Sequence, residues 1–157
     1  GLWILQRLMT EWEKRGIDCR FERLLPLAEQ SETAAVIAVD DPLFANPPSM
    51  EKAIAKWCTA HGVTPPQGEG ETVYCVLNSL ACRYARGIAE MNRLLPEPIR
   101  RLCIIGGGSR NGLLNRLTAK HAGIEVTTGP VEATAIGNIL VQAIAMGEIA
   151  GKNEVSS

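Results

Sequence analysis

Apolar residues recur at helical spacing through the first two thirds of the chain. Leu5, Leu8, Met9 and Trp12 follow an i, i+3, i+4, i+7 pattern, which predicts a helix over residues 2–15. The same kind of pattern predicts three more helices, over residues 21–30, 50–60 and 71–95. Two proline-rich segments, residues 40–49 and 65–70, are predicted to be loops, because proline lacks the N–H that a helix interior needs.

The last third of the chain alternates between predicted strands and predicted helices. Residues 102–105 form a short continuous apolar run, typical of a buried strand, and residues 124–128 are a second strand candidate. Helices are predicted over residues 111–122 and 132–149. This order predicts parallel strands joined by a right-handed crossover. The predicted fold class is therefore α/β, helix-rich with a small parallel sheet segment.

A sheet of only two parallel strands leaves both edges unpaired and is not stable by itself. We therefore expect further strands to come from a segment before residue 1. The sequence also starts at Gly1 without a methionine. Both observations favour a portion of a larger protein.

Composition excludes several classes of function. The chain has 157 residues, of which 46% are hydrophobic, and a net charge of −1, as expected for an ordinary globular domain. The chain has no excess of basic residues, so its charge gives no indication of nucleic-acid or membrane-surface binding. No apolar stretch reaches the roughly 18 residues of a membrane span, and charged residues interrupt the N-terminal apolar pattern, so we expect a cytoplasmic protein. The five cysteines include no C-x-x-C pair, which disfavours a zinc site.

A glycine-rich turn carries the strongest indication of chemistry. Gly106, Gly107 and Gly108 follow the predicted strand, and Ser109, Arg110 and Asn111 lead into the next helix. Glycines allow close approach of a ligand to the backbone, and the N-terminus of a helix suits a phosphate. Asn111 can cap that helix and hydrogen-bond a base or ribose. Because ligands bind at the carboxyl edge of open parallel sheets, this turn is a candidate nucleotide site.

The spacing of these glycines alone leaves a turn without a ligand as an open alternative. It is neither the G-x-G-x-x-G pattern of dinucleotide-binding folds nor a P-loop, because no Gly-Lys-Ser/Thr follows. Residues 129–138 form a second turn, after the next strand and on the same predicted edge. Its Gly137 would let that helix approach its neighbour closely, so helix–strand packing is the favoured explanation of that segment taken alone.

At these segments the sequence resembles the FGGY carbohydrate kinases. Residues 106–115, Gly-Gly-Gly-Ser-Arg-Asn-Gly-Leu-Leu-Asn, look like the adenosine-binding segment of that family, and residues 129–143 look like its C-terminal signature. Residues 1–6, 40–50 and 78–81 also resemble family segments. The resemblance implies an actin-like, ribonuclease-H-like kinase that transfers the γ-phosphoryl group of ATP, with magnesium, to the 1-hydroxyl of L-rhamnulose. Residues 1–157 would then be a portion of the C-terminal, ATP-side domain.

The resemblance also implies which residues contact the nucleotide. Gly107 and Gln6 match nucleotide-contacting positions, and their neighbours in the turn, Gly106, Gly108, Ser109 and Asn111, follow from them. No catalytic residue and no metal ligand is implied within the chain, because the family's catalytic aspartate belongs to the N-terminal domain, before residue 1. We therefore expect the chain alone to be inactive. Cys58 and Cys75 resemble a cysteine pair that is disulfide-linked in some members, although a reducing cytosol opposes such a bridge.

Two alternatives to this function stay open at the level of sequence. One is an FGGY kinase for another ketose or polyol, because sugar selectivity belongs mainly to the missing half. The other is a non-catalytic module that binds a nucleotide. For the kinase that the resemblance implies, the expected partners are ATP or ADP and the N-terminal domain of the same enzyme.

Overall fold

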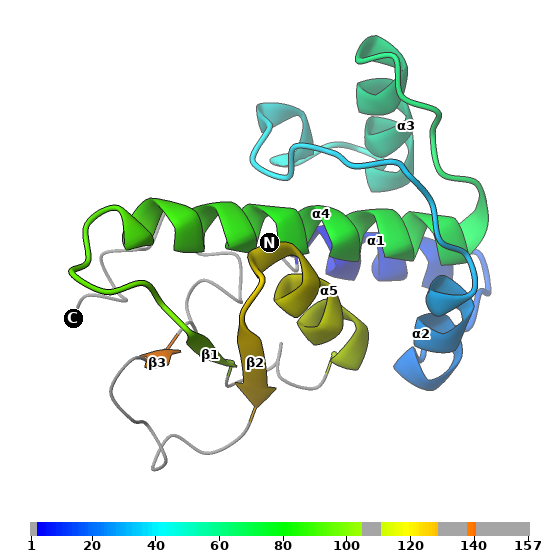
Figure 1. The fold of residues 1–157 in the computed structure, drawn as a ribbon. Coiled ribbons are helices and arrows are strands. Elements are labelled where there is room, and N and C mark those ends of the chain that lie inside the picture. Colours follow the sequence, from blue (N-terminus) through cyan, green and yellow to red (C-terminus); the bar gives the residue numbers. More distant parts are fainter. Residues whose placement is uncertain (1–2, 105–110, 129–137, 141–157) are drawn as a thin grey trace. The chain divides into compact units, whose positions relative to one another are not determined.

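The computed structural model describes residues 3–104, 111–128 and 138–140 (Figure 1). The chain divides into two compact units, which we call the helical unit (residues 3–79) and the α/β unit (from residue 80 onward). The described elements, in chain order, are α1 (Trp3–Glu13), α2 (Phe21–Glu29), the 3-10 helix η1 (Pro42–Phe44), α3 (Met50–Ala60), α4 (Gly68–Asn92), β1 (Arg101–Ile104), α5 (Gly112–Ala122), β2 (Glu125–Thr128) and β3 (Asn138–Leu140).

The apolar stripes predicted for the helices are largely confirmed by burial. In α1, Leu5, Leu8 and Trp12 are buried as predicted, together with Ile4, whereas Met9 is half-buried. In α2, Leu24 and Ala28 are buried and Leu25 is half-buried, whereas Phe21, the first residue of the helix, is 39% exposed. Burying each large side chain contributes about 1.5–3 kcal/mol, so these stripes hold the helical unit together.

The junction between α1 and α3 is built on carboxylates at a helix N-terminus. Ser49 caps α3, since its hydroxyl accepts a hydrogen bond from the Lys52 N–H at 3.2 Å. The Glu11 carboxylate accepts the Ser49 hydroxyl at 2.6 Å and the Met50 N–H at 2.9 Å. This negative charge lies at the positive end of the α3 dipole. The Trp12 indole N–H donates to the Glu51 carboxylate at 2.9 Å, which joins the two helices a second time.

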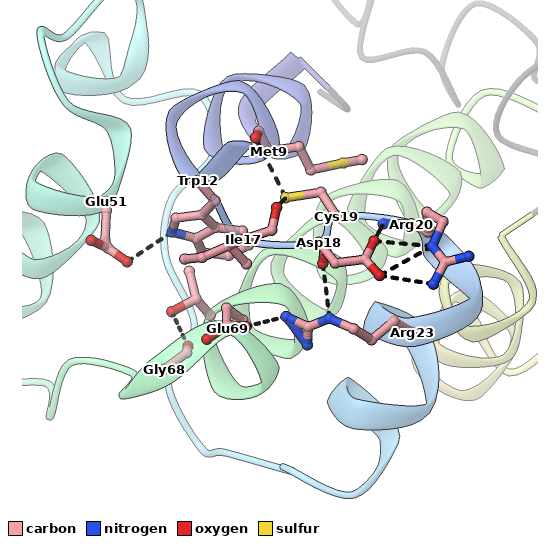
Figure 2. A network of polar contacts seen from close by, with 11 residues as sticks. Met9, Trp12, Ile17, Asp18, Cys19, Arg20, Arg23, Glu51, Gly68 and Glu69 are labelled. Atoms are coloured by element: carbon pink, nitrogen blue, oxygen red, sulfur yellow. Dashed lines mark hydrogen bonds and ion pairs between the residues drawn. The ribbon is translucent and has the colours of Figure 1, made fainter. Parts of the chain in front are cut away.

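Polar contacts also fix the segment that connects α1 to α2 (Figure 2). The Cys19 thiol donates to the carbonyls of Met9 and Ile17, each at 3.5 Å. The Arg23 side chain donates to the Asp18 carbonyl at 2.9 Å and forms an ion pair with Glu69 of α4. Gly70 allows α2 and α4 to approach, because a Cβ at that position would lie 2.4 Å from the Ser31 hydroxyl.

Helix α4 is displaced toward the N-terminus from its predicted range of 71–95. It begins at Gly68 because the Glu71 carboxylate accepts the Gln67 N–H at 2.9 Å, which satisfies a backbone donor ahead of the first turn. It ends at Asn92, whose side chain accepts the Ile99 N–H at 2.8 Å and stabilises the turn that follows. The large apolar side chains along α4 are buried except for Met91, which is half-buried; the buried ones include Val73, Val76, Leu77, Leu80, Tyr84 and Ile88.

The α/β unit contains a three-stranded parallel sheet in the order β2-β1-β3. The central strand β1 pairs with β2 from Arg101 opposite Glu125, and these two side chains form an ion pair at 2.8 Å. The predicted strands are confirmed within one residue. The helix predicted over residues 132–149 is wrong at residues 138–140, which form β3 on the other edge of β1. Without β3, this edge of β1 would leave its backbone N–H and C=O groups unpaired. Pairing with them stabilises this short apolar segment as a strand despite its helical spacing.

Two further sequence expectations concern membranes and cysteines. No helix within the described ranges is long and apolar enough to span a bilayer. Cys58 and Cys75 are both buried and both free thiols, so the disulfide suggested by resemblance is not formed in this structure. Burial, and secondarily the neighbouring Cys58, raises the pKa of Cys75 to about 12.

Candidate nucleotide site

The candidate site lies at the carboxyl edge of the parallel sheet. Strand β1 ends at Ile104 and α5 begins at Gly112, so the glycine run falls on the connection between them. The three strands are parallel, and their carboxyl ends therefore share one edge of the sheet. In open parallel sheets this edge is where ligands bind.

Asn111 occupies the start of α5 and makes only part of the hydrogen bonding that its amide allows. Its side-chain oxygen accepts the Leu114 N–H at 2.9 Å, which confirms the predicted cap. The side chain is buried, with 3% of the residue exposed. Its Nδ2 atom has no hydrogen-bond partner among the described residues. An unsatisfied buried donor costs about 1–3 kcal/mol, so this amide is a candidate contact for an acceptor outside the described residues.

The surroundings of Asn111 favour an anionic or oxygen-rich acceptor. The first backbone N–H groups of a helix have no partner within the helix, and the helix dipole gives that end a partial positive charge. The backbone of Asn111 is extended, with φ −93° and ψ 91°, so the chain turns into α5 at this residue. Together these features form the kind of N-terminus that binds phosphate or ribose oxygens.

The other predicted contacts divide between the described and the undescribed parts of the chain. Gly106, Gly107, Gly108 and Ser109 lie outside the described residues, as do Arg110 and residues 129–137 of the second turn. Gln6 is described, and it is an exposed residue of α1 within the helical unit. Its neighbours Ile4 and Leu5 are buried, so its amide is on the solvent side of that helix.

The structure contains two features that sequence spacing did not predict. The first is an open pocket of about 300 Å³ in the helical unit, lined by Ile54, Pro65, Pro66, Gln67 and Thr72 among others. None of the predicted site residues lines it. The second is a contact of 3.6 Å between the Cys82 thiol and the His121 ring. These two residues are separated by 39 positions, so only the packing of α4 and α5 brings them together.

Metal ligands do not gather in the part of the chain that the structure describes. Within those residues no three His, Cys, Asp or Glu side chains come close enough to hold an ion together. Asp40 and Asp41 instead belong to the turn before η1, where the Asp41 carboxylate accepts the Leu43 N–H at 2.9 Å. We therefore assign no metal ligand to the described residues.

Comparison with known proteins places this sequence in a family. Residues 1–146 match the C-terminal domain of the FGGY family of carbohydrate kinases. The chain is 42% identical to a rhamnulokinase of Bacteroides thetaiotaomicron, in a match that covers 100% of this chain and 32% of that protein. It is 40% identical to a rhamnulokinase of Pectobacterium carotovorum, over 96% of this chain and 30% of that protein. For a rhamnulokinase of Bacillus subtilis the identity is 37%, over 95% of this chain and 30% of that protein.

These relatives are much longer than the matched segment. The chain spans about a third of the length of the curated relatives it matches, and the matched family region is a C-terminal domain. The resemblance stated on the glycine segments is thereby confirmed over nearly the whole sequence. The chain belongs to the FGGY family of carbohydrate kinases, of which it carries the C-terminal domain.

Proposed function

We propose that this chain is the nucleotide side of an ATP-dependent sugar kinase, and that the sugar is L-rhamnulose, phosphorylated at its 1-hydroxyl. The FGGY match supports the reaction class, and the three relatives named above, which are rhamnulokinases, support the sugar. In this proposal the sheet β2-β1-β3 and its helices are a portion of an actin-like, ribonuclease-H-like domain.

The observation that carries the proposal is the half-satisfied amide of Asn111. Its oxygen caps α5, whereas its buried Nδ2 has no partner among the described residues. We propose that Nδ2 donates to an oxygen or ring nitrogen of the nucleotide, beside the backbone of Gly106, Gly107, Gly108 and Ser109. Gln6 is proposed as a second contact, for which its exposed amide is suited.

Phosphoryl transfer needs more than this domain supplies. The reaction depends on holding both substrates in line and on metal-assisted stabilisation of the phosphoryl charge. We propose that the N-terminal domain of the same enzyme provides the catalytic base, the magnesium site and most sugar contacts. The chain alone is then inactive, and ATP-dependent phosphorylation of L-rhamnulose by this polypeptide would contradict that statement.

The nucleotide contact is tested by calorimetric titration of the chain with ADP. Asn111→Ser keeps an oxygen that can cap α5 but removes Nδ2, so ADP should bind roughly 3- to 10-fold more weakly while stability is nearly unchanged. Asn111→Ala removes both groups and should lose affinity and about 1 kcal/mol of stability. Unchanged ADP affinity in Asn111→Ser would refute the contact.

The kinase assignment is tested in a chimera. The matching third of the Bacteroides thetaiotaomicron rhamnulokinase is replaced by this chain, and phosphorylation of a panel of ketoses by ATP is measured. We expect activity on L-rhamnulose, and a raised KM for ATP in the Asn111→Ser chimera. A folded chimera without activity on any ketose would count against the kinase function. Because the recipient supplies most sugar contacts, the sugar is tested separately, by assaying the full-length enzyme that contains this chain on the same panel, and activity limited to another ketose there would count against L-rhamnulose.

A further inference from the structure

Cys82 and His121 form a thiol–imidazole pair in the α/β unit. Cys82 lies on α4 and His121 in the last turn of α5, with 3.6 Å between Sγ and Nε2. This distance is within hydrogen-bonding range for sulfur, so the thiol donates its proton toward the ring nitrogen when Nε2 is unprotonated. A proton acceptor beside a thiol is the arrangement that prepares a cysteine for nucleophilic attack.

Accessibility distinguishes Cys82 from the other cysteines whose side chains the structure describes. Cys19, Cys58 and Cys75 are buried, whereas Cys82 is half-buried. His121 is exposed. A small reagent in solvent therefore reaches the Cys82 sulfur more readily than the other three.

The charges around the pair suit the transfer of a proton from sulfur to nitrogen. Arg86 is one helical turn after Cys82, and its positive charge favours the thiolate. Burial is the larger influence and raises the pKa of Cys82, while Arg86 acts against that rise. His121 lies in the last turn of α5, so its ring is beside the carbonyl end of that helix.

We propose that Cys82 is a modification site for hydrogen peroxide and related small peroxides, with His121 as its proton acceptor. Sulfur attacks one peroxide oxygen and forms an S–O bond as the O–O bond breaks. The thiol proton passes to Nε2 of His121 and then to the departing hydroxide, which leaves as water. Sulfur is oxidised by two electrons to a sulfenic acid, and the peroxide is reduced by the same two electrons.

The test follows sulfenic acid formation at each cysteine. The chain is exposed to hydrogen peroxide, the sulfenic acid is trapped with dimedone, and the labelled peptides are quantified by mass spectrometry. We expect label at Cys82 well before the buried Cys19, Cys58 and Cys75. His121→Gln should slow labelling of Cys82 about tenfold, a modest general-base effect. The matched control is His61→Gln, which changes the other histidine and should leave the rate unchanged.

A rescue experiment separates proton transfer from packing. Added imidazole should restore part of the lost rate in His121→Gln, because a free base can replace the missing ring, whereas a packing defect would not respond. Circular dichroism checks that the variant is folded. An unchanged Cys82 rate in His121→Gln would overturn the proposal, as would equal labelling of the three buried cysteines in the native chain or failure of imidazole to restore any rate.

Discussion

The helical unit and the α/β unit use their polar side chains differently. In the helical unit, polar side chains serve the fold: the half-buried Glu11 and Ser49 cap α3, and the buried Ser79 hydroxyl accepts the Ile37 N–H at 2.9 Å. Among residues 3–79 no buried side-chain nitrogen or oxygen lacks a hydrogen bond. In the α/β unit the buried Nδ2 of Asn111 has no partner within the described residues.

This difference agrees with the nucleotide contact proposed at Asn111. Buried polar groups in folded proteins are almost always paired, so a buried donor without a partner marks a place where something other than the fold supplies the acceptor. Substitutions in the helical unit are therefore expected to change mainly the free energy of unfolding. Substitutions in the α/β unit are expected to change ligand binding.

The largest stability effect is expected at Gly70, where α2 and α4 approach. An alanine Cβ there would lie 2.4 Å from the Ser31 hydroxyl oxygen and 3.0 Å from the Leu27 carbonyl oxygen. Gly70→Ala should therefore cost about 2–3 kcal/mol of unfolding free energy, measured by urea denaturation. The matched control is Gly87→Ala in the same helix, where the nearest atom is the Arg83 Nη1 at 3.5 Å. Gly87→Ala should gain up to about 1 kcal/mol, and a similar loss in both variants would contradict the close approach.

The next effect tests the carboxylate at the N-terminus of α3. Glu11→Gln removes the charge that accepts the Ser49 hydroxyl and the Met50 N–H, and should cost about 1.5–2 kcal/mol. Glu13→Gln, on the exposed side of α1, should change stability by less than about 0.5 kcal/mol. Equal denaturation midpoints for the two variants would show that the helical unit does not depend on this cap.

A smaller effect is expected from the buried thiol of Cys75 at alkaline pH. Its pKa is raised to about 12 in the fold, so the folded state keeps a proton that the unfolded state releases. This stabilisation is present below the unfolded-state pKa near 9 and is lost as pH rises from there toward 12. Between pH 8 and pH 10 the loss is on the order of 1 kcal/mol under reducing conditions. Cys75→Ala should flatten that part of the pH profile, and an unchanged slope would contradict the burial.

The smallest effect is expected at the exposed Asp18. Hydrogen bonds from the Arg20 side chain and then from its backbone N–H lower the pKa of Asp18. The contribution is present above the ordinary aspartate pKa and is lost as pH falls through the lowered value. Arg20→Gln should raise the pKa of Asp18 toward its ordinary value, as followed by NMR titration of the carboxyl carbon. High salt should shrink the difference between the two proteins, because this pair is exposed.

The helices could be predicted from the sequence because their information is local. The α3 range was predicted without error, since Ser49 supplies the cap and Ile54 and Cys58 the buried face. The start of α4 could not be predicted as easily, because it depends on a carboxylate that reaches back to Gln67. Strand β3 was missed altogether, since its pairing partner β1 lies far away in sequence and the local spacing favours a helix.

The candidate site was predictable to a similar degree. The cap formed by Asn111 follows from its residue type and its place before an apolar helix, and the structure confirms it. The unsatisfied Nδ2 could not be predicted, because it depends on burial by neighbours from other elements. The Cys82–His121 contact could not be predicted from the sequence either, since no periodicity relates two positions on different helices. The proposed contacts at Gln6 and Gly107 stay predictions.

Helix α4 has a practical consequence for dividing this domain. Its 25 residues run without a break from the helical unit into the α/β unit, whose boundary falls between Ser79 and Leu80. Cutting the chain there would leave about four carbonyls and four N–H groups of the severed helix without partners, most of them among buried side chains. Recombination between family members is therefore better placed in the loop at Pro65 and Pro66 or in the turn after Asn92, where an exchanged piece would keep α4 whole.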